Sequence, residues 1–239
     1  MAQGLRLGVL PEGYIYPKAA RAVRDVVRTR AHLVRQHTVH GLSVHNILAR
    51  NTGARFSAKR MHACTKADLE DLLPEAHQGL AVTSSLARLE CLRQQINTLE
   101  KAVTTALQHT PAYEQLLTVD GIGTMLAQTI GLETGDSSRL PTVGTSASDY
   151  RWVKRTKISN GKRQGQGNVN NGHPYLECAS REAAQCASRF SPTVPRFDPR
   201  QQATSPLMVA RKAVAHTRAR ASYDVLRDFV PFDGHKAFG

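Results

Sequence analysis

Apolar residues recur every three or four positions over long stretches of the chain, a spacing that places them on one face of an α-helix. The first stretch runs from Pro17 toward Arg50, and Asn51, Thr52 and Gly53 end it. Its apolar stripe consists of Val23, Val26, Val27, Leu33, Val34, Leu42, Ile47 and Leu48. The pattern predicts a long amphipathic helix, and proline is well suited to its first turn.

A second helical stretch follows a short acidic helix, which is predicted to begin after Thr65 and to end before Pro74. Its apolar positions come close to a heptad repeat over about three to four heptads. These positions are Val82, Leu86, Leu89, Leu92, Ile96, Leu99, Val103 and Leu107. We interpret them as a coiled coil or a long helical hairpin arm. One amphipathic helix packed on its own domain explains the spacing equally well.

The pattern is mixed after Pro111, with a helical block, a polar loop over residues 135–172 and two further helices. The first, at about 175–190, is predicted to bury Leu176, Ala179, Ala183 and Phe190. The second, at about 206–229, carries a stripe of Val209, Ala213, His216, Tyr223 and Leu226. The terminal VPFDGHKAFG is expected to dock on the fold. No strand pattern exceeds a few residues, so the predicted class is mainly α.

The net charge indicates which class of molecule the protein binds. The chain has 239 residues and a net charge of +13. Residues 1–60 carry a net +9 and residues 137–239 a net +10, whereas residues 61–136 carry a net −6. Lysine and arginine placed on phosphates release counterions, so this distribution favours a nucleic acid as the partner. Solvated basic helices are the alternative.

The sequence also bounds the cellular environment. No apolar run approaches the ~20 residues needed to cross a bilayer, and the N-terminus lacks an apolar signal segment. The cysteines form no C-x-x-C pair, which argues against a disulfide framework and a zinc knuckle. They are Cys64, Cys91, Cys178 and Cys186. We therefore expect a soluble, cytoplasmic protein with no membrane partner.

A Gly-Ile-Gly turn lies between two predicted helices within residues 116–130. Its form, apolar-x-Gly-apolar-Gly-x-x-x-Ala, is typical of helix-hairpin-helix elements. Gly121 and Gly123 allow a tight turn and a close approach to a partner, and the next helix presents free N–H groups to an anion. We predict that both glycines contact the DNA backbone. An ordinary turn between helices is the alternative.

Residues 151–176, RWVKRTKISNGKRQGQGNVNNGHPYL, are rich in glycine and contain six basic residues and no acid. A loop of this composition can wrap a phosphate backbone. Its predicted DNA-binding residues are Lys154, Arg155, Lys157, Asn160, Gly161, Lys162 and Arg163. Tyr150, Trp152 and Tyr175 are available to stack on bases or to anchor the loop to the core. A disordered surface loop is the alternative.

Ser159 stands within this loop, and by composition Ser-Asn-Gly indicates only a turn. A serine that attacks a DNA phosphodiester needs cations to stabilise the charge on phosphorus and a group that takes its proton. Lys157, Lys162 and Arg163 could supply the cations. Nothing nearby in the sequence supplies the proton acceptor.

No metal site is predicted. His173 with Cys178 and Cys186 matches no usual ligand spacing, so buried thiols and an exposed histidine explain them better. Surface positions likewise explain His37 and His40. Carboxylates flank the Gly-Ile-Gly turn and could hold Mg²⁺, although helix capping accounts for them. They are Asp120, Glu133 and Asp136.

Four blocks of the sequence together resemble one family. The blocks are LPEGYIYPKAARAVRDVVRTRAHLVRQHTVHGLSVHNILARNTG, GIGTMLAQTIGLETGD, ISNGKRQGQGNVNNGHPYL and VARKAVAHTRARASYDVLRDFVPFDGHKAFG. In this order they resemble transposases of the IS-one-ten family of insertion sequences, IS-eleven-eleven branch. The resemblance covers nearly the whole chain, and four separated blocks are specific where any one would be weak.

The resemblance implies a mechanism. Members of that family join a RuvC-like domain, whose four carboxylates bind Mg²⁺, through a coiled-coil arm to a C-terminal domain with a serine nucleophile. Matching the motifs places that serine at Ser159. The resemblance implies guide-RNA-directed DNA recombination, in which the serine becomes linked to DNA and a partner subunit's carboxylates complete the site.

Departures from the family pattern concern the N-terminus most. Only ten residues precede Pro11, so the family's metal-binding carboxylates have no counterpart here. We expect an N-terminally truncated copy that holds no cofactor itself and is catalytically incomplete alone. The stretches 146–151 and RFDPRQQAT, from Arg196, also depart from the family pattern.

The resulting prediction is a mainly α protein of three segments. Residues 1–60 are expected to be a basic helical remnant of a RuvC-like domain, and residues 61–112 an acidic coiled-coil arm that joins copies into a homo-oligomer. Residues 113–239 are expected to be the transposase domain, with the helix-hairpin-helix and the serine loop. DNA and a guide RNA are the expected partners. A non-enzymatic DNA- or RNA-binding remnant is the competing interpretation.

Overall fold

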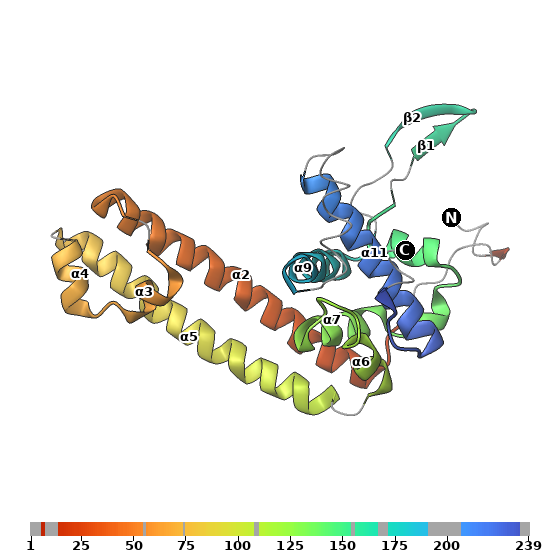
Figure 1. Cartoon of the computed structure of the whole chain (residues 1–239), viewed down its shortest axis with the longest axis horizontal. Coiled ribbons are helices and arrows are strands. Elements are labelled where there is room, and N and C mark those ends of the chain that lie inside the picture. The colour runs from red at the N-terminus through yellow and green to blue at the C-terminus, as the bar shows by residue number, and fades with distance from the viewer. Residues whose placement is uncertain are drawn as a thin grey trace. The chain divides into compact units, whose positions relative to one another are not determined.

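The computed structural model describes residues 6–7, 14–54, 56–73, 75–107, 110–153, 156–166, 172–190 and 207–234. Helices dominate these residues, which confirms the predicted mainly α class (Figure 1). The chain divides into two compact units. Asp25–Ala106 form one, here called the arm, and Met1–Arg24 with Leu107–Gly239 form the other, here called the C-terminal unit. The three functional segments predicted from sequence stay a prediction.

The arm is an antiparallel helical hairpin. Its helices are α2 (Lys18–Thr52, whose first turns belong to the C-terminal unit), α3 (Ala58–Ala63), α4 (Lys66–Leu72) and α5 (Ala76–Leu107). Arg30 on α2 donates to Glu100 on α5 at 2.6 Å, and Arg88 on α5 lies 3.5 Å from His40 on α2. Residue numbers rise on one helix as they fall on the other, so the helices are antiparallel. A helical hairpin was one of the forms that the apolar spacing left open, and a coiled coil between copies stays a prediction.

The core of the arm contains part of the predicted apolar stripes. In α2, Leu42 of the predicted stripe is 58% exposed, whereas Val44, which the stripe omitted, is fully buried. Val82 and Leu89 of α5 are fully buried and belong to one cluster with Val44 and Leu48 of α2. The short helices close this cluster with Phe56, Met61, Leu69 and Leu73.

Helix α4 begins directly after its N-cap residue Thr65, as predicted. The Thr65 side chain accepts from the Asp68 backbone N–H, and the Asp68 carboxylate accepts from the Thr65 backbone N–H. These reciprocal bonds satisfy two donors that a helix start otherwise leaves open. The hydrogen bonds from Thr65, first that of its backbone, lower the pKa of Asp68.

The C-terminal unit packs several short helices around two longer ones. Its elements are α6 (Pro111–Leu116), α7 (Thr124–Thr134), the 3₁₀ helix η1 (Ser137–Arg139), α8 (Val143–Asp149), β1 (Thr156–Ser159), β2 (Lys162–Gln166), α9 (Pro174–Phe190) and α11 (Leu207–Asp228). Helix α11 packs on α9, α8 and α6, and α7 packs on α9. Alanines such as Ala183 and Ala219 occupy this core, so the helix backbones come close together.

The predicted stripes of the last two helices are partly wrong. Leu176, Tyr223 and Leu226 are buried as expected, but Phe190 is 81% exposed and Val209 is 48% exposed. The buried face of α11 also contains valine, alanine and polar positions that the predicted stripe omitted. These are Val214, Ala215, Arg218, Ala219, Ala221, Ser222 and Val225.

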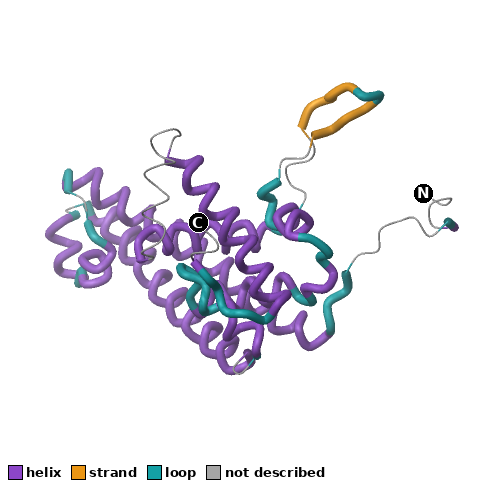
Figure 2. The backbone as a smooth tube through the Cα atoms, turned by 45° about the vertical axis from the view of Figure 1, so that its right-hand side comes forward, coloured by secondary structure: helices purple, strands orange, loops and turns teal. Residues whose placement is uncertain are grey.

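The predicted polar loop over residues 135–172 is also wrong in part, because it contains η1, α8 and an antiparallel strand pair (Figure 2). Helix α8 forms because the Thr142 hydroxyl caps it by accepting from the Thr145 N–H. The strand pair forms because Asn160 and Gly161 both adopt positive φ, at 51° and 70°. Two such residues in sequence favour the tight turn of a two-residue hairpin.

The described part of the C-terminal tail docks on the unit, as predicted. The Phe232 backbone N–H donates to the Thr118 hydroxyl at 2.8 Å, and its ring packs against the main core cluster. Residues 235–239 lie outside the described residues. Within the described ranges, no helix combines the length and the apolar character that a membrane span requires.

Candidate nucleic-acid interface

The predicted nucleophile lies at the tip of the strand pair. Ser159 is the last residue of β1 and pairs directly with Lys162, the first residue of β2, across the turn. Directly opposite residues of an antiparallel pair project from the same face. The Ser159 and Lys162 side chains therefore project from the same face of the strand pair, whose backbone Figure 2 shows.

Four of the predicted loop residues, Ser159 to Lys162, are exposed at this tip. Lys154 and Arg155 lie outside the described residues, and for Lys157 and Arg163 the structure describes the backbone alone. Ile158, next to the serine, is 66% exposed. A solvent-facing serine with a lysine beside it can approach a phosphodiester from the strand end.

Within the described part of the chain, no proton acceptor for a nucleophilic serine is bonded to Ser159. Among the described residues, no hydrogen bond involves its side chain. The hairpin therefore provides a hydroxyl and a cation, and within the described ranges it provides no general base.

The two glycines of the Gly-Ile-Gly turn have different surroundings. Gly121 has φ 86°, and a Cβ placed there would lie 2.3 Å from the Ala183 carbonyl oxygen and 2.8 Å from the Ala187 Cβ of α9. Its close approach is thus to the protein's own helix. Gly123 begins α7 with nothing within 4 Å of a placed Cβ, so the space beside that helix start is open. DNA contact at both glycines stays a prediction, and packing alone explains why residue 121 is glycine.

The two ends of the serine loop meet at what we call the loop base, residues 149–152 and 172–173. The His173 backbone N–H donates to the Asp149 carbonyl at 2.7 Å. The Arg151 guanidinium donates to the Gly172 carbonyl at 3.1 Å, and the Trp152 indole N–H donates to the Ser180 hydroxyl at 2.9 Å. These bonds tie both ends of the loop to α8 and α9.

Two of the aromatic residues beside the loop pack into the protein. Tyr150 is 1% exposed and lies in the main core cluster, where burial raises the pKa of its phenol. Trp152 is half-buried against the same cluster. Of the two roles that the sequence left open, anchoring is the one observed for both, because their rings are packed in protein.

A buried carboxylate lies directly behind the loop base. Glu133, at the end of α7, is fully buried, with Oε2 3.1 Å from His173 Nε2 and 3.9 Å from Arg24 Nε. The Arg24 guanidinium stacks 3.7 Å from the centre of the Tyr16 ring, and the Tyr16 hydroxyl donates to the Glu133 carbonyl at 2.5 Å. Burial raises the pKa of Tyr16, so the phenol keeps the proton that it donates.

The three carboxylates near the Gly-Ile-Gly turn do not form a metal site. Glu133 faces His173 and Arg24, Asp136 caps η1 by accepting from the Ser138 N–H, and Asp120 lies 4.0 Å from Arg218. Capping, the explanation preferred from sequence, is confirmed for Asp136. Across the described part of the chain, no three metal-ligating side chains cluster. Glu133, Asp136 and Asp120 therefore do not fit a shared Mg²⁺ site.

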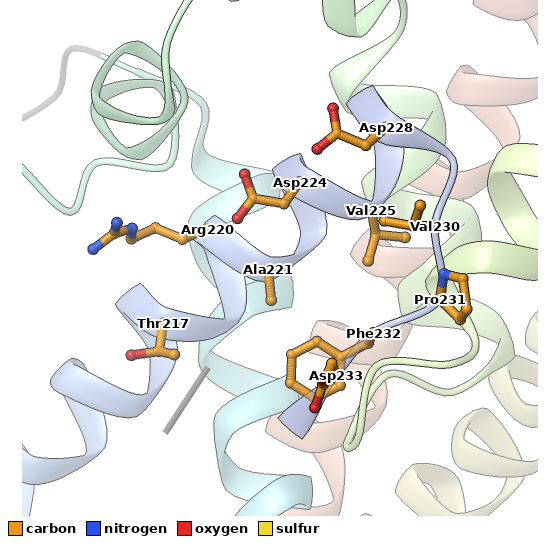
Figure 3. A pocket seen from close by; sticks show the side chains of 10 residues that line it. All are labelled: Thr217, Arg220, Ala221, Asp224, Val225, Asp228, Val230, Pro231, Phe232 and Asp233. Carbon is orange, nitrogen blue, oxygen red and sulfur yellow. The ribbon is translucent and has the colours of Figure 1, made fainter. Parts of the chain in front are cut away.

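A separate groove runs along α11, where the C-terminal tail folds back (Figure 3). Its volume is about 710 Å³, and its lining includes the carboxylates of Asp224, Asp228 and Asp233 with the guanidinium of Arg220. Burial raises the pKa of Asp224. The carboxylates outnumber the cation among the lining residues, so this groove is poorly suited to a phosphate.

Sequence reasoning missed the Glu133–His173 contact. The two residues are 40 positions apart, and nothing in the local pattern of either indicates the other. A glutamate at the end of an apolar helix was a weak signal of a buried partner, because a buried carboxylate requires one.

Comparison with known proteins places this site in a family. Residues 113–198 match the sequence profile of the Transposase IS116/IS110/IS902 family. The match begins in α6 and includes the Gly-Ile-Gly turn, the hairpin with Ser159 and α9. No curated protein shows significant similarity to the chain. The predicted resemblance is confirmed at the level of this family over residues 113–198, which are similar to transposases, and the branch within the family stays a prediction.

Proposed function

We propose that the chain is a recombinase that acts in DNA transposition and that Ser159 is its nucleophile. The observation that carries the proposal is the position of this serine. It is exposed at a hairpin tip, directly opposite Lys162, inside the region that matches a transposase family. The resemblance of the ISNGKRQGQGNVNNGHPYL block to the family's serine motif supports the same residue.

The chemistry is a phosphoryl transfer to serine. The Ser159 Oγ forms a bond to phosphorus while the bond from phosphorus to one deoxyribose oxygen breaks. The hydroxyl proton passes to water, and the released oxygen takes a proton to become a free hydroxyl end. Lys162, on the same face of the hairpin, is placed to stabilise the negative charge that grows on the phosphate oxygens.

Three further features belong to the proposal. The open start of α7 at Gly123 contacts the DNA backbone as part of a helix-hairpin-helix element, which the empty space there supports. The arm joins copies through a coiled coil, and a guide RNA selects the target. The heptad-like spacing supports the coiled coil, and the family resemblance supports the RNA.

A trapping assay tests the proposal. The full chain is mixed with a labelled suicide DNA substrate, with and without candidate guide RNA and Mg²⁺, and the products are separated under denaturing conditions. The proposal expects a denaturation-resistant protein–DNA adduct, because this half-reaction needs only the serine. Complete recombination, by contrast, is expected to need the partner subunit's carboxylates that the family resemblance implies. Absence of an adduct under every condition, with DNA binding intact, would contradict the enzymatic role.

A non-enzymatic DNA-binding protein is the second candidate function. The observation that favours it is that the Ser159 side chain makes no hydrogen bond to a base among the described residues. Such a protein would use the same basic hairpin to hold DNA and would form no adduct. The trapping assay therefore separates the two candidates.

The salt dependence of binding tests the DNA contact at the hairpin. Replacing Lys162 with glutamine is expected to reduce the slope of log K against log salt by about 0.9, because one phosphate contact is lost. Titration of a fluorescent duplex at several salt concentrations measures this slope. Lys101→Gln, an exposed lysine on α5, is the matched control and should leave the slope unchanged. An unchanged slope in the Lys162 variant would place the phosphate contacts elsewhere.

A further inference from the structure

The loop base is backed by a carboxylate with no access to solvent. Glu133 is fully buried, and its Oε2 faces the His173 imidazole at 3.1 Å and the Arg24 guanidinium at 3.9 Å. A buried carboxylate is costly unless cationic or hydrogen-bonding groups surround it. His173 and Arg24 are both far from Glu133 in the sequence. Their contacts with its carboxylate therefore hold three separate segments of the chain together.

His173 connects this carboxylate to the serine loop. Its backbone N–H donates to the Asp149 carbonyl at 2.7 Å, while its imidazole reaches Glu133. The residue is 14 positions after Ser159 and closes the loop from the C-terminal side. On the N-terminal side, the Trp152 indole bonds to Ser180. His173 thus holds the returning end of the loop with two contacts, one from its backbone N–H and one from its imidazole.

The backbone at the loop base adopts unusual conformations. Arg151 has φ 62°, a region that non-glycine residues rarely occupy, and Gly172 has φ 103°. A Cβ at residue 172 would lie 2.7 Å from the Asp149 carbonyl oxygen and 2.9 Å from that of Ser148. Such conformations persist only where the surroundings hold them, and they concentrate at functional sites.

We propose that Glu133 and His173 are positioning residues for the Ser159 loop, an inference that rests on the proposed function. The Glu133 carboxylate orients the His173 imidazole, and His173 fixes the returning end of the loop on α8. A loop held at both ends samples fewer conformations, so its serine is presented to the phosphodiester more often. The pair therefore increases the rate of adduct formation.

The burial of Glu133 and His173 distinguishes a positioning role from a direct role in DNA binding. Glu133 is fully buried and the His173 side chain is 19% exposed, so neither residue presents a cation to a phosphate. Loss of the pair should slow the reaction of bound DNA and leave the affinity for DNA unchanged.

Two substitutions at residue 173 differ in whether the new side chain is long enough to reach Glu133. The amide nitrogen of glutamine is as many bonds from Cα as Nε2 of histidine, whereas that of asparagine is one bond shorter. His173→Gln can therefore still donate to Glu133, and His173→Asn cannot. Glu133→Gln removes the charge and keeps the shape. His77→Gln, at a histidine side chain that is 91% exposed, is the control.

Hydrogen–deuterium exchange of the full chain without DNA gives a readout independent of activity. We expect exchange at residues 149–153 and 172–176 to become about tenfold faster in His173→Asn and Glu133→Gln. His173→Gln and the control should resemble the wild type. Wild-type exchange in both His173→Asn and Glu133→Gln would overturn the positioning role. If Glu133→Gln fails to fold, as judged by circular dichroism, His173→Asn decides alone.

Single-turnover trapping on bound suicide DNA gives the second readout. We expect His173→Asn to form the adduct about tenfold more slowly, with the dissociation constant for DNA within about twofold of wild type. An equal loss of affinity and rate would overturn the inference. If the wild type itself forms no adduct, the proposed function fails, and the exchange measurement still shows whether the pair holds the loop.

Discussion

Replacing Ser159 with alanine is expected to abolish the protein–DNA adduct completely. The substitution removes the only atom that forms the bond to phosphorus in the proposed reaction, and alanine cannot replace it. Ser159 is exposed at the end of β1, so the fold should lose little stability, on the order of 0.5 kcal/mol or less. Denaturing gels of the trapping reaction measure the adduct, and duplex titration measures the affinity.

Gln164→Ala is the matched control for this experiment. Gln164 is exposed on β2 of the same hairpin, where the register shift between the strands leaves it without a directly paired residue. This variant should form the adduct at the wild-type rate. Adduct formation by Ser159→Ala would contradict the assignment and direct attention to another nucleophile.

Replacing Gly121 with alanine is expected to destabilise the C-terminal unit by roughly 2 to 5 kcal/mol. Two costs combine. The residue has φ 86°, which side-chain-bearing residues rarely adopt, and the new Cβ would lie 2.3 Å from a backbone oxygen of α9. Because this clash is with backbone, no side-chain rotation relieves it. Chemical denaturation followed by circular dichroism measures the loss.

Gly144→Ala controls for the general effect of losing a glycine. Gly144 lies within α8, is exposed, and a Cβ there meets only the Thr142 hydroxyl at 3.7 Å. Alanine should be neutral or stabilising by up to about 1 kcal/mol, because it favours the helix. Wild-type stability in Gly121→Ala would contradict the packing that we describe for α9.

Much of the helical architecture follows from local sequence rules. The start of α2 after Pro17, its end at Gly53 and the Thr65 cap of α4 were all readable, because capping and helix termination depend on residues within one turn. The α9 and α11 interface was not. Helices α9 and α11 contact through alanines and a valine, and the buried Arg218 of α11 lies near Asp120, which is distant in sequence. Such a contact has no periodic signature.

In the candidate site too, some features have a local sequence signal and others depend on tertiary structure. Asn160 and Gly161 carry a local hairpin signal, yet the low apolar content of the flanking residues made the stretch resemble a loop. The serine itself was identifiable only through the resemblance of its block to a family, because Ser-Asn-Gly alone indicates a turn. The Glu133–His173 pair depends on how α7 packs behind the loop base, which tertiary structure decides.

The most direct test of the central claim is to identify the amino acid that is joined to DNA. The wild-type adduct, trapped on suicide DNA, is digested with protease and nuclease, and the modified peptide is sequenced by mass spectrometry. If Ser159 is the nucleophile, one peptide from the hairpin carries a nucleotide joined through its phosphate to Ser159. A nucleotide joined to any other residue would contradict this assignment.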